Sequence, residues 1–245
     1  MNANVFEKAR TPDRIRKPMP ASRKIALAGG VFYLLTFVSV PQFLLYARVR
    51  DPNYLLSPGP DTGVITGGIL EITVALTGIA TAVALFPALK RQNESFALGL
   101  IGSRILEAAT IFAGVVSLLT MVTLRKSGVG AGGLVTGQAL IALSDWFHLG
   151  QAIMPVVDDL LLGTLLYQSR IVPRVLPVLA FIGAPVLAAN TVLRIFGVTG
   201  PALTLTTFGV IPIALFEFAL GVYLIVKGFK PTAITAELDR QESQH

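Results

Sequence analysis

Five charged residues inside apolar segments are the groups of this sequence best suited to chemistry. They are Arg104, Glu107, Asp158, Asp159 and Glu217. Each lies near the middle of an apolar run that is long enough to cross a bilayer, where an Arg or Asp costs roughly 2.5–3.5 kcal/mol even on lenient insertion scales. Charged side chains at such depth pair with one another, face a water-filled cavity, or take up a proton or a cation.

The five side chains are expected to form one layer. At about 1.5 Å of rise per residue from the cytoplasmic end of each run, Arg104 lies about 12 Å deep and Glu107 about 17 Å, on one helix face. Asp158 and Asp159 lie about 12–14 Å deep, and Glu217 about 15 Å. Because four carboxyl groups face one guanidinium, pairing with Arg104 cannot neutralise all of them.

This excess of acids leaves two functional hypotheses open. In the first, the layer serves a small proton- or cation-coupled carrier. In the second, the layer is an ion-paired structural core of a non-catalytic membrane sensor or assembly module. An enzyme is less favoured, because the sequence has no nucleophile elbow, phosphate-binding loop or dinucleotide-binding glycine pattern. Neither a substrate nor a cofactor is indicated.

Two further groups of polar residues are expected near the outer membrane face. Glu71 and Arg194 fall at roughly 27–32 Å depth by the same rise, so we expect them to form an ion pair. Asp145 and His148 are three residues apart and are expected to form a hydrogen-bonded pair at the interface, with Trp146 at headgroup depth. The only other histidine is His245, so we expect no metal site.

The composition identifies a membrane protein. Of the 245 residues, 53% are hydrophobic and only 14% are charged, against about 25% charged residues in soluble domains. The net charge of +6 does not indicate a nucleic-acid partner, since the basic residues gather at the ends of apolar runs. The chain contains no cysteine, which excludes disulfides and thiolate chemistry. The expected partner is the lipid bilayer, and a homo-oligomer is compatible with the small protomer.

The apolar runs predict an all-α polytopic membrane bundle of about six transmembrane helices. A basic, poorly ordered tail (1–23) precedes the six-span membrane domain (24–229), and a second tail (230–245) follows it. A short interfacial helix is expected before the fourth span, from about residue 134, with a bend near Gly150 or Pro155. Tyr33, Tyr167 and Tyr223 fall near span ends, as in an aromatic belt. The spans are expected at about 25–47, 64–89, 96–124, 149–167, 175–196 and 205–226.

The distribution of basic residues predicts the orientation. With six spans and the N-terminus inside, 14 of the 20 Lys and Arg residues fall in cytoplasmic segments and four in outer loops. This asymmetry indicates that both termini lie in the cytoplasm.

Four stretches carry a family resemblance: RKIALAGGVFYLLTFV (23–38), ALFPALKRQNESFALGLIGSRILEAA (84–109), LLLGTLLYQSRIVPRVLPVLAFIGAP (160–185) and LFEFALGVYLIVKGF (215–229). Through them the chain resembles the bacterial membrane-protein family known as domain of unknown function 4386. The resemblance implies a multi-pass protein of the bacterial inner membrane. It implies no activity, so no residue receives a role from it.

Overall fold

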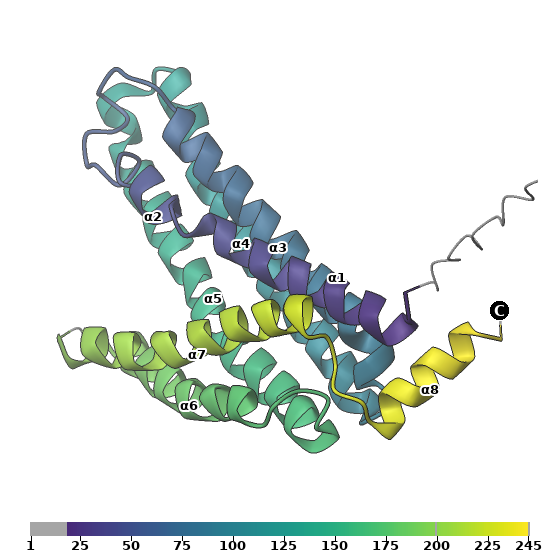
Figure 1. Ribbon diagram of the computed structural model, residues 1–245. Coiled ribbons are helices and arrows are strands. Elements are labelled where there is room, and N and C mark those ends of the chain that lie inside the picture. Colours follow the sequence, from purple (N-terminus) through teal and green to yellow (C-terminus); the bar gives the residue numbers. More distant parts are fainter. Residues whose placement is uncertain (1–18, 199, 245) are drawn as a thin grey trace, which may run out of the picture.

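The computed structural model describes residues 19–198 and 200–244, and these residues form helices and no strands (Figure 1). Within these described residues, six helices are long and apolar enough to cross a membrane. The predicted all-α bundle with about six spans is therefore confirmed. The α-helices are α1 (Ala21–Leu35), α2 (Gln42–Leu45), α3 (Thr62–Leu89), α4 (Glu94–Lys126), α5 (Leu134–Ser169), α6 (Val175–Ile195), α7 (Gly200–Val226) and α8 (Ala233–Glu242).

The six long helices pack in chain order around a closed ring. Each neighbour along the chain is also a neighbour in space, and α1 and α7 close the ring. Figure 1 shows the α6–α7 hairpin inclined to the other spans and crossing them near the end of the bundle that carries α8. Side chains that point inward from α1, α4, α5 and α7 can therefore meet in the interior of one ring.

The outward faces of the ring are apolar. On α3, Ile69 and Leu76 are more than half exposed, and on α4 the same holds for Leu98 and Val116. Water would make such a surface costly at about 25 cal/mol per Å², whereas lipid chains solvate it. The helices thus present the surface that contact with a bilayer requires.

Glycines permit the closest helix contacts. A Cβ atom at Gly30 of α1 would lie 2.8 Å from the backbone oxygen of Gly221 in α7. A Cβ atom at Gly183 of α6 would lie 2.9 Å from the backbone oxygen of Gly209, also in α7. Small residues at helix interfaces let backbones approach in membrane bundles, so α7 depends on them on both sides.

The first span ends earlier than expected. The regular helix α1 ends at Leu35, a 3₁₀ turn η1 (Thr36–Ser39) follows, and the short α2 begins after Pro41. Proline has no amide hydrogen to continue a helix, so Pro41 separates η1 from α2 instead of lying within one span of residues 25–47.

The prediction of a separate interfacial helix before the fourth span is wrong. After a 3₁₀ turn η2 (Gly130–Gly133), α5 runs without interruption from Leu134 to Ser169 and contains Pro155. Gly150 does not break the helix. A Cβ atom there would lie 2.5 Å from Thr110 Oγ1 of α4, so Gly150 brings α4 and α5 into close contact.

The helix α8 lies across one end of the ring. Thr232 and Thr235 form a capping box at its start, and Leu238 is buried. The Ser22 amide donates a hydrogen bond to Asp239 Oδ1 over 2.8 Å, which ties α8 to the start of α1. The beginning of α1 and α8 therefore lie at the same end of the bundle, called the α8 end below (Figure 1).

Candidate functional site

Arg104 is the centre of the charge layer in the ring interior. Its Nη1 lies 2.9 Å from Glu107 Oε2 on the same helix, and its Nη2 lies 3.2 Å from Glu217 Oε1 on α7. Its Nε lies 3.2 Å from Asp158 Oδ2 on α5. Guanidinium groups suit this arrangement because their five donors point in a fixed fork. One arginine thus connects carboxyl groups from three helices.

Two hydroxyl groups complete this network. The Tyr33 hydroxyl of α1 accepts a hydrogen bond from Arg104 Nη2 over 3.3 Å. Ser103 donates a short hydrogen bond to Asp158 Oδ1. Tyr33 is 1% exposed, so its expected place in an interfacial aromatic belt is wrong. The network therefore draws on α1, α4, α5 and α7.

Asp159 is the exception in the layer. Its side chain is completely buried, and neither carboxyl oxygen has a hydrogen-bond partner. An unpaired, desolvated carboxylate is among the most expensive groups a protein interior can hold. Asp159 must therefore be neutralised by a proton or by a cation that reaches it.

A cavity of about 150 Å³ lies against the layer. Arg104, Glu107 and Glu217 form its charged wall, and Thr36, Phe37, Val40, Val74 and Pro155 form the rest. A space of this size beside three charged side chains can hold several water molecules. The layer is therefore in contact with an open space and is not sealed on all sides.

Glu71 forms a second buried polar cluster, with partners that the sequence did not indicate. Its Oε2 accepts a hydrogen bond from the Tyr46 hydroxyl over 2.8 Å, and its Oε1 lies 2.9 Å from His148 Nε2. No ion pair joins the described residues Glu71 and Arg194. The prediction that these two residues pair is therefore wrong. His148 passes Gly114 of α4, where a Cβ atom would lie 3.3 Å from its Cε1 atom. The absent side chain gives the imidazole a route from α5 to α3.

The Glu71–His148 contact holds a proton. His148 Nδ1 lies 2.7 Å from the backbone oxygen of Ser144. A carbonyl oxygen only accepts, so Nδ1 carries a hydrogen. Nε2 then faces a carboxyl oxygen, and this contact is a hydrogen bond only if a proton sits on one of the two groups. Glu71 and His148 thus share one proton.

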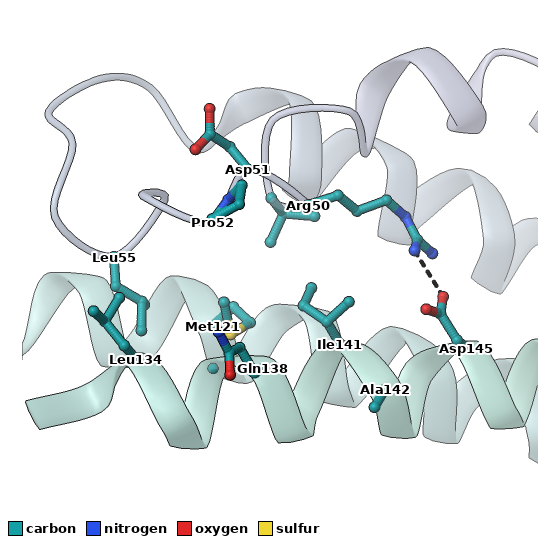
Figure 2. Close-up of a pocket in the computed structure, with 12 residues that line it drawn as sticks. Arg50, Asp51, Pro52, Leu55, Met121, Leu134, Gln138, Ile141, Ala142 and Asp145 are labelled. Carbon is teal, nitrogen blue, oxygen red and sulfur yellow. Dashed lines mark hydrogen bonds and ion pairs between the residues drawn. The ribbon is translucent and has the colours of Figure 1, made fainter. Parts of the chain in front are cut away.

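Asp145 pairs with Arg50 and not with His148. Arg50 Nη1 lies 2.7 Å from Asp145 Oδ1, and both side chains are substantially exposed (Figure 2). The expected hydrogen bond between Asp145 and His148 is therefore wrong. Trp146 is 59% exposed on the outside of the helix. Figure 2 shows that Arg50 reaches across to α5 from the loop after α2, which fixes this loop against the helix.

Arg50, Asp145 and His148 also line a larger cavity at the end opposite α8. Its volume is about 410 Å³, and Gln42, Tyr46 and Arg194 complete the lining. The expected outer group of charges is therefore brought together, although with other pairings.

The comparison with protein families shows to which family the chain belongs. The family model described as a domain of unknown function (DUF4386) matches residues 28–228. The chain belongs to this family. All members of the charge layer, and Glu71 and His148, lie within the matched DUF4386 region. No curated protein and no solved structure matches the chain.

Sequence reasoning missed four residues of these sites. Tyr33 and Ser103 contact the Arg104 layer, while Tyr46 and Arg50 bind Glu71 and Asp145. Tyr33 gave a misleading signal, because a tyrosine near a span end is typical of an interfacial aromatic belt. Tyr46 and Arg50 gave no signal, since their partners depend on how the chain folds back after Pro41.

Proposed function

We propose that this DUF4386 protein is a small proton- or cation-coupled carrier whose central charge layer takes up and releases the coupling ion. The supporting observation is that a cavity contacts a layer with four acids and one base. A purely structural ion-paired layer has no need of excess acids or of an opening to water. An excess of carboxyl groups beside water provides sites that can alternate between charged and neutral states.

The proton is the coupling ion that the side chains favour. Asp159 needs neutralisation, and Glu71 and His148 already share a proton. Glu71 lies one helical turn before Val74, which lines the cavity at the layer. In the proposed relay, a proton passes from His148 and Glu71 to Glu107 and Glu217, which line this cavity, and then to Asp158 and Asp159. Chains of Asp, Glu and His residues are the usual proton relays inside membranes.

The test is proton flux in proteoliposomes under an imposed potassium diffusion potential, read with a pH-sensitive dye inside the vesicles. Glu107→Gln and Asp159→Asn are expected to lower the flux to that of empty liposomes, because amides cannot carry the proton. Glu94→Gln is the matched control, since Glu94 is an exposed residue on the same helix as Glu107. If both buried variants fold and keep the wild-type flux, the carrier proposal is wrong.

A membrane sensor or assembly module is the second candidate. It is favoured by the way Arg104 connects three helices through carboxyl groups. Such a module needs the layer for assembly only. It therefore predicts no proton flux in the wild-type protein, together with normal assembly when Arg104 and Glu107 exchange places.

A further inference from the structure

The cavity opposite the α8 end is large enough for a small organic molecule. Its volume of about 410 Å³ falls within the range of about 300–1,000 Å³ typical of ligand pockets. The cavity at the charge layer, at about 150 Å³, suits water or a small ion. Of these two spaces, the first is the one that can select a solute.

The cavity wall carries one positive charge that no acidic group of the wall neutralises. Asp145 is neutralised by Arg50. Glu71, behind the wall, is hydrogen-bonded to His148 and to Tyr46. Arg194 is exposed and forms no ion pair within the described part of the chain. A free guanidinium on a cavity wall binds a carboxylate or another oxyanion through two parallel hydrogen bonds. A single unmatched positive charge favours a group with a single negative charge.

Gln42 adds a second requirement for the bound molecule, which is a hydrogen-bond donor. The residue is 7% exposed and lines the cavity, and its Oε1 atom has no hydrogen-bond partner. A buried amide oxygen without a donor costs about 1–3 kcal/mol. A bound molecule with a hydroxyl group would satisfy it, because a hydroxyl can donate as well as accept.

From these observations we propose that the cavity binds a small hydroxy-monocarboxylate. Its carboxylate contacts Arg194 and its hydroxyl group contacts Gln42. As the place where the carrier takes up its solute, the site rests on the function proposed above and names its substrate class. As a binding site it can be measured without transport.

Calorimetric titration of the purified full-length protein with lactate tests the site. Lactate is expected to bind saturably, and Arg194→Gln is expected to weaken binding about ten- to a hundredfold, the loss typical of a charged hydrogen-bond partner. Arg174→Gln is the matched control. It removes an exposed arginine at the other end of α6 and is expected to leave binding unchanged.

Two further titrations separate the chemical groups. Propionate, which lacks the hydroxyl, is expected to bind about two- to tenfold more weakly than lactate, and Gln42→Met is expected to abolish this difference. Inorganic phosphate distinguishes a lipid-phosphate site from a carboxylate site. The proposal is overturned if lactate does not bind, if Arg194→Gln binds it as tightly as the wild type, or if phosphate binds and lactate does not.

Proton flux in the same preparations separates this inference from the carrier proposal. Flux without lactate binding overturns the binding site alone. Lactate binding that depends on Arg194, without flux under any gradient, supports the site and overturns the carrier.

Discussion

At the scale of single residues, Arg104 has the largest expected effect on stability. It is 7% exposed and pairs with Glu107, Asp158 and Glu217. Breaking a buried ion pair by removing one partner costs about 3–5 kcal/mol, because the other charge stays buried without compensation. In this network a single change leaves three acids without their cation.

We therefore expect Arg104→Gln to lower the unfolding free energy by at least about 3 kcal/mol, with Arg104→Lys restoring part of the loss. Thermal unfolding of the purified protein in detergent measures the effect. Arg50→Gln is the control, because its pair with Asp145 is exposed and such pairs contribute about 0–1 kcal/mol. Equal melting temperatures for Arg104→Gln and Arg50→Gln would show that the layer does not hold the bundle together.

Asp61 is the residue whose titration outside the spans should affect stability. Partial burial by itself raises its pKa. Hydrogen bonds from Tyr54 and Arg125, together with the Arg125 charge, outweigh burial and hold the pKa below its ordinary value. A group with a lowered pKa contributes stability above its unfolded pKa of about 3.9 and loses it as pH falls through the folded pKa.

The wild-type melting temperature should therefore fall as pH drops from about 5 to 3, and Asp61→Asn should show a smaller fall, since its amide does not titrate. Melting curves of both proteins across this range check the difference. Asp51→Asn serves as control, because Asp51 is an exposed acid in the preceding loop. Parallel pH profiles for the wild type and Asp61→Asn would contradict the assignment.

At the scale of the elements, helix contacts decide where the charges meet. Gly30 lets α1 approach α7, which places Tyr33 and Glu217 on the same side of Arg104. Without this approach, the layer would lose its α1 and α7 members.

Gly30→Ala is expected to destabilise the protein by about 1–3 kcal/mol, since the added methyl group meets backbone and the helices must separate. Gly102→Ala is the matched control. It lies exposed within α4, and a Cβ atom there meets nothing within 4 Å. This change should be neutral or slightly stabilising, because alanine favours a helix by up to about 1 kcal/mol. Chemical unfolding of both variants distinguishes the steric clash at Gly30 from a general effect of replacing a helical glycine by alanine.

The elements also show how far the sequence could predict the site. Arg104 and Glu107 meet because their spacing of three places them on one helix face, which depends on α4 alone. The depth of Asp158 and Glu217 within their spans predicted that both lie at the same level as Arg104. The partner of Glu71 depended on the rotation of α5 and on the missing side chain of Gly114. Neither feature can be deduced from the depth of a residue, so the prediction that Glu71 pairs with Arg194 was wrong.

At the scale of the whole molecule, the ring has two unlike ends. One carries α8 and the start of α1, with Ser22 bound to Asp239. The other carries the loop after α2 and the larger cavity. Carriers need their coupling site accessible from defined sides, so the proposed direction of proton entry depends on which end faces the cytoplasm. From the bias of Lys and Arg we propose that the α8 end faces the cytoplasm.

This orientation can be measured with single cysteines, because the natural chain contains none. Ser243 and Ser127 are exposed serines that follow α8 and α4, at opposite ends of the bundle. In bacterial spheroplasts, a membrane-impermeant maleimide should label Ser127→Cys directly and Ser243→Cys only after the membrane is permeabilised. The reverse pattern would place the larger cavity in the cytoplasm, so that a solute bound there would be leaving the cell and not entering it. Labelling of both cysteines in intact spheroplasts would contradict an even number of spans.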